Sequence, residues 1–90
     1  MQEKEIDTVV KLEDFTIIVN ARKKKWTEKK ISFRQAVELA YGSFEDNPDI
    51  SYTVTYSDGP EPKPEGRLVD GQSVKVKNGM IFNVKRTDKS

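Results

Sequence analysis

Residues Ile31–Gly42 read ISFRQAVELAYG and contain the local signals that a short helix needs. Ser32 is a good N-cap residue, and Gln35, three positions later, completes a capping box. Gly42 readily adopts the left-handed conformation that ends many helices. The apolar residues fall on one stripe at helical spacing: Phe33, Ala36, Val37, Ala40 and Tyr41. The stretch therefore predicts an amphipathic helix over Phe33–Tyr41.

Two strands are predicted before this helix. Beginning at Asp14, apolar side chains recur at every second position, as is typical of a half-buried strand: Phe15, Ile17 and Val19. Asn20–Lys24 is polar and turn-like, and Lys25–Lys30 alternates again. We expect this second run to return as the other half of a hairpin, with its lysines along an exposed sheet edge.

The residues after the helix predict further strands. A third strand is indicated by the alternation of Tyr52, Val54 and Tyr56. Ser57–Gly71 holds three of the four prolines and is expected to be a loop. Val74 and Val76 open a short strand, and Asn78–Gly79 predicts a tight type I′ turn into a last strand, Met80–Lys85.

The order of these elements indicates the fold. One helix must cover the apolar face of one sheet, because neither element buries its face alone. If the two hairpins flank the helix, the first and last strands can pair in parallel at the centre of the sheet. This arrangement is an α+β fold, the ubiquitin-like β-grasp, with a ββαββ mixed sheet packed on one helix. A different strand order would give a generic α+β roll.

The chain is expected to form one domain with two short flanking segments. Residues 14–86 form the β-grasp domain, and residues 87–90 form a C-terminal tail. Residues 1–13 are an N-terminal extension with some apolar character. This extension is either a disordered leader or an extra strand added to a sheet edge, for example on a neighbouring copy, which would amount to self-association.

Composition restricts the chemistry. The 90 residues include 16 Lys or Arg and 15 Asp or Glu, a net charge of +1 that argues against a dedicated nucleic-acid arm. The chain has no Cys and no His, which excludes disulfides, thiol nucleophiles and imidazole bases. Asp46, Asp49 and Asp58 lack the spacing of a calcium loop. We expect a binding, carrier or modifier domain, not an enzyme, with no metal and no cofactor.

Location and charge lead to further expectations. No apolar run reaches the roughly 18–20 residues that span a bilayer, and the first residues do not resemble a signal peptide. We expect a cytoplasmic protein without a membrane partner, since a small secreted domain usually needs disulfides. The basic run Arg22–Lys30 indicates solvated turns or contact with phosphates. With Trp26 as its only aromatic residue, we expect no nucleic-acid partner.

The second half of the chain carries a more specific pattern. Residues of unusual type stand at fixed offsets in Gly59–Pro60, Lys63–Gly66, Leu68–Val69, Gly71, Ser73–Lys77, Gly79–Val84 and Thr87–Ser90. Together with Thr16–Asn20 and Tyr52–Tyr56, this pattern resembles the bacterial multiubiquitin family over roughly residues 14–90. The resemblance implies a ubiquitin-like modifier that is conjugated to a target protein in defence against phage. Its partners would be ubiquitin-activating-like and ubiquitin-conjugating-like enzymes and a deubiquitinase-like peptidase.

In such a modifier the reacting group is the carboxylate at the mature C-terminus. We therefore assign conjugation and processing to a flexible tail that leaves the last strand: Arg86, Thr87, Asp88, Lys89 and Ser90. The chain departs from the family in being a single copy and from ubiquitin in lacking a terminal diglycine, which passes easily through a narrow channel. The tail must fit a different channel or be trimmed first. Frayed end residues without a role are the alternative.

A second site follows from strand alternation. Ile18 and Ile81 lie on the faces opposite the inward residues of the first and last strands, so adjacent strands would join them in a small apolar surface for a partner. Scattered surface apolar residues are the alternative. A non-conjugated β-grasp adaptor or assembly module that binds partners through its sheet is the rival function.

Overall fold

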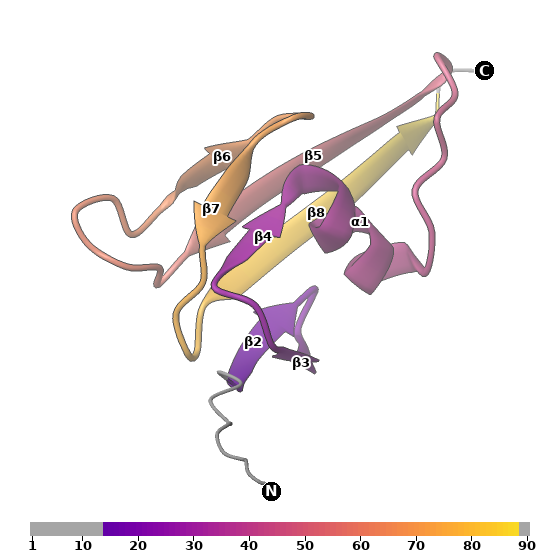
Figure 1. Ribbon diagram of the computed structural model, residues 1–90. Coiled ribbons are helices and arrows are strands. Elements are labelled where there is room, and N and C mark those ends of the chain that lie inside the picture. The colour runs from indigo at the N-terminus through magenta and orange to yellow at the C-terminus, as the bar shows by residue number, and fades with distance from the viewer. Residues whose placement is uncertain (1–13, 89–90) are drawn as a thin grey trace, which may run out of the picture.

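The computed structural model describes residues 14–88. The chain forms, in order, β2 (Phe15–Val19), β3 (Arg22–Trp26), β4 (Lys30–Ser32), α1 (Phe33–Tyr41), β5 (Ile50–Ser57), β6 (Gly66–Leu68), β7 (Ser73–Lys75) and β8 (Ile81–Asp88) (Figure 1). Residues 1–13, expected to be a leader or an added strand, lie outside the described residues, as do Lys89 and Ser90.

Helix α1 begins and ends where the sequence predicts. The backbone N–H of Gln35 donates to Ser32 Oγ at 3.1 Å, and the Ser32 N–H donates to Gln35 Oε1 at 2.9 Å, so the capping box is complete. Gly42 follows the helix at φ +88° and donates its N–H to the Glu38 carbonyl. Both ends of the helix are therefore specified by nearby residues.

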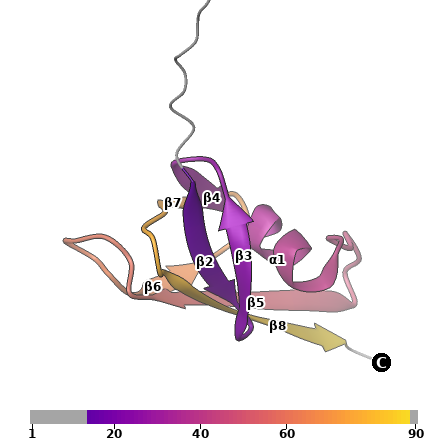
Figure 2. The ribbon, with the colours of Figure 1, turned by 90° about the horizontal axis from the view of Figure 1, so that it is seen from below.

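The five-stranded sheet confirms the β-grasp fold. Its strand order is β3-β2-β8-β5-β6, with β2 and β8 parallel at the centre and the other pairs antiparallel. Helix α1 lies along one face of this sheet, and a small second sheet pairs β4 with β7 (Figures 1 and 2). The chain thus buries one helix against one mixed sheet, as the order of its elements predicts.

The first hairpin is shorter than predicted. Its second strand is β3, at Arg22–Trp26, so the expectation of a strand over Lys25–Lys30 is wrong. Asn20 and Ala21 form a two-residue turn in which both residues have positive φ, the turn type that fits the twist of a hairpin. Lys30 instead begins β4, because Ile31 pairs with Val74 of β7.

The second hairpin does not form. Strand β7 pairs with β4 and not with β8, so the predicted type I′ turn at Asn78–Gly79 is wrong. Of these two residues only Gly79 has positive φ, and the Met80 N–H donates to the Lys77 carbonyl. The turn docks on the start of β2, where Asn78 Oδ1 and the Gly79 N–H bond to the backbone of Thr16, each at 2.7 Å.

The region predicted to be a loop contains a strand. Strand β6, at Gly66–Leu68, pairs with Val54–Tyr56 of β5 at the edge of the sheet. Leu68 is 4% exposed and contributes to the core between the helix and the sheet. The core consists of Ile17, Val19, Ile31, Phe33, Ala36, Val37, Val54, Tyr56, Leu68, Val76, Met80, Phe82 and Val84.

Candidate functional site

Strand β8 continues to the end of the described chain. Its pairing with β5 extends over eight residue pairs, from Ser57 opposite Ile81 to Ile50 opposite Asp88. The expectation of a flexible tail that starts at Arg86 is therefore wrong for Arg86, Thr87 and Asp88, which are strand residues with exposed side chains. The reason is that β5 itself begins early enough to supply them with ladder partners.

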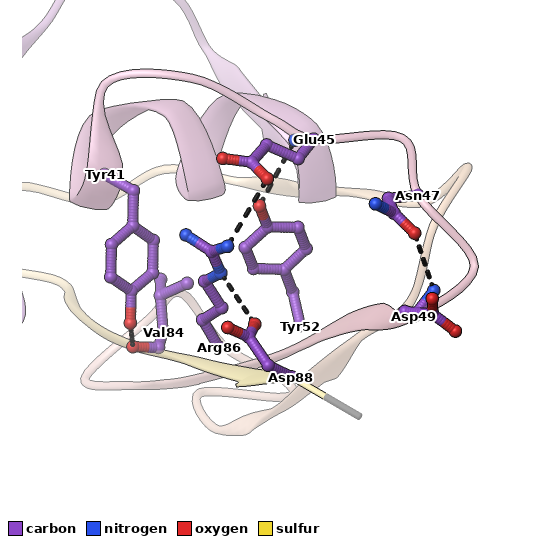
Figure 3. Close-up of polar contacts among 8 residues, drawn as sticks. All are labelled: Tyr41, Glu45, Asn47, Asp49, Tyr52, Val84, Arg86 and Asp88. Carbon is purple, nitrogen blue, oxygen red and sulfur yellow. Dashed lines mark hydrogen bonds and ion pairs between the residues drawn. The ribbon is translucent and has the colours of Figure 1, made fainter. Parts of the chain in front are cut away.

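The Arg86 side chain is fixed by two carboxylates. Its Nε lies 3.0 Å from Asp88 Oδ1, and its Nη2 lies 3.3 Å from Glu45 Oε1 (Figure 3). The hydrogen bond to Asp88, with the negative charges of Asp88 and Glu45, raises the pKa of the Arg86 guanidinium. Arg86 thus ties the end of β8 to the loop that follows α1.

Aromatic residues stabilise the same end of the sheet from the helix side. The Tyr52 ring lies 5.2 Å from the Phe44 ring and 6.1 Å from the Tyr41 ring, measured between centroids. The Glu45 N–H donates to Tyr52 Oη at 3.2 Å. The loop is also closed by Asn47, whose Oδ1 accepts the Asp49 N–H at 2.8 Å (Figure 3). The ends of β5 and β8 are therefore held by side chains as well as by their ladder.

Val84 marks the point where β8 loses its second neighbouring strand. Strand β2 ends at Val19, and the Asn20 side chain then takes the place of a strand residue. Asn20 Oδ1 accepts the Val84 N–H at 2.8 Å, and Asn20 Nδ2 donates to the Val84 carbonyl at 3.0 Å. Tyr41 Oη donates to the same carbonyl at 3.1 Å. The backbone of Val84 is thus satisfied by two side chains.

Ile18 and Ile81 lie directly opposite each other. The parallel pairing of β2 with β8 places them in register, and both are half-buried. Their neighbours Ile17, Val19 and Phe82 are nearly inaccessible on the helix side of the sheet. The structure therefore brings the two isoleucines together on the open face. Their role as a partner surface stays a prediction.

A groove that the sequence did not indicate lies beside the loop after α1. Its volume is about 350 Å³, and its apolar lining consists of Phe33, Phe44, Ile50, Tyr52, Leu68 and Val69. The rim carries both signs of charge, from Glu45, Asp46, Asp70 and Arg67. Sequence reasoning had no signal for the groove, because three separate segments supply its walls.

Arg34 links the helix to the far wall of this groove. Its guanidinium makes two hydrogen bonds to the Asp70 carboxylate, at 3.0 and 3.1 Å, and lies 4.4 Å from the centre of the Phe44 ring. The hydrogen bond from Arg34 lowers the pKa of Asp70, and the same pair raises the pKa of Arg34. The pair is solvent-exposed, so its strength depends on salt.

The lowered pKa of Asp70 predicts a pH-dependent contribution to stability. A carboxyl group whose pKa is depressed by folding stabilises the protein above its unfolded value of about 3.9, and this contribution is lost as the pH falls through the folded value. We expect wild type to have a higher Tm than Asp70→Asn at pH 7 and low salt. The difference should shrink between pH 5 and pH 2.5 in thermal melts. A difference independent of pH would contradict this assignment.

Two further features concern metals and membranes. In the part of the chain from residue 14 to residue 88, no three acidic side chains gather as a metal site would require. Among the same residues, no helix has both the length and the apolar character needed to cross a bilayer.

A comparison with protein families shows that the model of the multiubiquitin family matches residues 15–88. The match runs from the first residue of β2 to the last residue of β8, so it covers every helix and strand described above. The comparisons with curated proteins and with solved structures found no match. Since the family match covers the whole folded domain, and the parallel β2–β8 pair gives that domain a ubiquitin-like topology, the chain belongs to the multiubiquitin family.

Proposed function

We propose that this protein is a bacterial ubiquitin-like modifier, a substrate of conjugating enzymes and not itself an enzyme. The observation that carries the proposal is the family match over the whole β-grasp domain. The direction of β8 supports it, since this strand leads from the buried centre of the sheet to the exposed residues Arg86–Asp88. The reacting chain end is then presented by a rigid strand that is anchored in the core.

The proposed chemistry needs only the carboxylate of the mature C-terminus. That carboxylate attacks the α-phosphate of ATP to give an acyl adenylate and pyrophosphate. An enzyme thiolate then displaces AMP to form a thioester, and a target amine displaces the thiolate to form an amide. The modifier supplies only its carboxylate, whereas the thiolate comes from an enzyme and the amine from the target, which is compatible with a modifier that has no Cys and no His.

The proposed tail, Arg86–Ser90, contains no diglycine. The reacting carbonyl belongs to a residue within Arg86–Ser90, either at the end of that segment or exposed by a peptidase that trims it. We propose that a ubiquitin-activating-like enzyme, a ubiquitin-conjugating-like enzyme and a deubiquitinase-like peptidase act there, in the cytoplasm and in defence against phage. The target protein is a further partner.

Mass spectrometry after co-expression tests this proposal. The full chain would be produced with and without an activating-enzyme-like protein and a peptidase-like protein, the two enzymes that the proposal requires. We expect a shortened C-terminus only when the peptidase-like protein is present. We expect an acyl adduct, including a thioester that dithiothreitol releases, only when the activating-enzyme-like protein is present. A full-length, unmodified mass under every condition would overturn the proposal. It would favour the rival function, a non-conjugated adaptor.

The Ile18–Ile81 pair is the observation that favours a binding role for the sheet. Two half-buried isoleucines in direct register form an apolar site on the open face of the sheet. We propose this pair as the partner surface, either of the modifier or of the rival adaptor.

Replacing both Ile18 and Ile81 with threonine keeps their β-branched shape and removes apolar surface. We expect the double variant to bind its partner with a Kd at least tenfold higher than that of wild type. Isothermal calorimetry measures both values, with the protein that wild type binds as the titrant. Val69→Thr is the matched control, because Val69 is 51% exposed and follows β6, which β5 separates from β8. Equal affinity of the double variant and the control would show that the pair is not a binding surface.

A further inference from the structure

The edge of β8 that faces β2 is open beyond Val84. The Ile18 and Asn20 N–H groups donate to the carbonyls of Met80 and Phe82, and the Asn20 amide bonds to Val84. Even-numbered residues of β8 therefore direct their backbone groups toward β2. Along a strand these directions alternate, so Lys85 and Thr87 face β5.

Arg86 and Asp88 are the next even-numbered residues, and β2 has ended before it reaches them. Their backbone N–H and C=O groups point to a side of the sheet where the described residues supply no strand. The Arg86 side chain does not fill this position, because Glu45 and Asp88 hold it over the helix side. Two consecutive rungs of a ladder are thus available to an added strand.

A side chain beside this edge would support such a strand. Tyr41 is 44% exposed, one of two large apolar residues in the described chain with that much exposure. Its hydroxyl bonds to the Val84 carbonyl, so the ring stands at the point where the open edge begins (Figure 3). A strand added next to Arg86 would have an apolar ring within reach of its first side chain.

We propose that this edge receives an extended segment of the activating-enzyme-like protein, by strand addition. The inference rests on the proposed function and identifies how the enzyme would recognise the chain end. The proposed function places the reacting carbonyl within Arg86–Ser90 and therefore at most two residues past Asp88. Two extended residues span only about 7 Å, so an enzyme that reaches this carbonyl must approach the strand end closely. Hydrogen bonds between the backbone of β8 and the backbone of the enzyme segment would give affinity that does not depend on the side chains of the tail.

Proline variants test this recognition. Asp88→Pro removes an N–H from the open edge and leaves the ladder with β5 intact. We expect its kcat/KM to fall at least tenfold in ATP–pyrophosphate exchange with the purified activating-enzyme-like protein. Lys23→Pro is the matched control. Lys23 lies opposite Ile18, whose N–H donates to the Met80 carbonyl, so this pair makes no hydrogen bonds within the hairpin and the Lys23 N–H points to the outer edge of β3. We expect Lys23→Pro to react like wild type.

A third variant distinguishes the role of the Asp88 backbone N–H from that of the Asp88 side chain. Asp88→Ala keeps the N–H and removes only the contact with Arg86, so we expect a loss of at most threefold. If kcat/KM falls as much for Asp88→Ala as for Asp88→Pro, the enzyme recognises the Asp88 carboxylate and the inference of strand addition is wrong. If Asp88→Pro reacts like wild type, the inference is overturned while the proposed function stands. If wild type itself supports no exchange, the proposed function fails.

Amide hydrogen exchange gives a second measurement that needs no variant. In the free protein, the amides of Arg86 and Asp88 should exchange faster than those of Lys85 and Thr87, which face β5. Addition of the activating-enzyme-like protein with a non-hydrolysable ATP analogue should protect the first two by at least tenfold. Binding without this added protection would overturn the inference, and so would protection that a second copy of the chain produces in the absence of enzyme.

Discussion

Phe82→Ala is expected to lower the free energy of unfolding by about 3–5 kcal/mol, the usual cost of removing a large ring from a core. Phe82 is completely buried in β8, opposite Val19 on one side and Tyr56 on the other. Its ring centroid lies 6.2 Å from that of Tyr56. The substitution would leave a cavity where β2, β5 and β8 meet, and the surrounding strands cannot close it without breaking their ladder.

Urea denaturation followed by circular dichroism measures this effect. Ile81→Ala is the appropriate control, because Ile81 is the adjacent residue in the same strand and is only half-buried on the other face. We expect its cost to be less than half that of Phe82→Ala. Equal costs for the two variants would mean that the helix side of the sheet is not the main core.

Asn20→Ala is expected to cost about 2–4 kcal/mol, although Asn20 lies in an exposed turn. The substitution removes two hydrogen bonds to the Val84 backbone, each worth about 0.5–1.5 kcal/mol. It leaves the part-buried Val84 N–H without a partner, although Tyr41 Oη still donates to the Val84 carbonyl. It also places alanine at φ +52°, where asparagine is more readily accommodated. The same denaturation experiment measures the loss.

Two further variants separate these causes. Asn20→Gly tolerates the positive φ but restores no hydrogen bond, so it should recover only the conformational part of the loss. Asn20→Asp keeps the acceptor for the Val84 N–H and loses the donor to the Val84 carbonyl. We expect both to be intermediate between wild type and Asn20→Ala. If Asn20→Gly were as stable as wild type, the side-chain bridge to β8 would contribute nothing.

The features that were predicted most accurately from the sequence are those that depend on contacts between residues close together in the chain. Helix α1 was predicted to the residue, because Ser32, Gln35 and Gly42 specify both of its ends through contacts within a few positions. The central pairing of β2 with β8 followed from the number and order of elements, because one helix and one sheet leave few ways to bury their apolar faces.

The errors concern pairings between distant residues. Asn78–Gly79 is a strong local signal for a hairpin between β7 and β8. In the structure, however, β7 pairs with β4, and the Asn78 side chain accepts a hydrogen bond from the Thr16 backbone. Strand β6 has only Leu68 as an apolar signal, and its partner β5 is what makes it a strand. Arg86–Asp88 looked like a tail because its residues are polar, yet Ile50–Tyr52 holds it in the sheet.

The length of the β5–β8 ladder has a mechanical consequence. A machine that unfolds a conjugate by pulling on the C-terminal end along the strand would load eight residue pairs in shear at once. A pull across the sheet would instead open the pairs one at a time, starting at Asp88 and Ile50. Resistance to forced unfolding is set by the unfolding rate along the pulled direction. The direction of the pull relative to β8, which depends on how the target is attached, would therefore determine how fast the modifier unfolds under force.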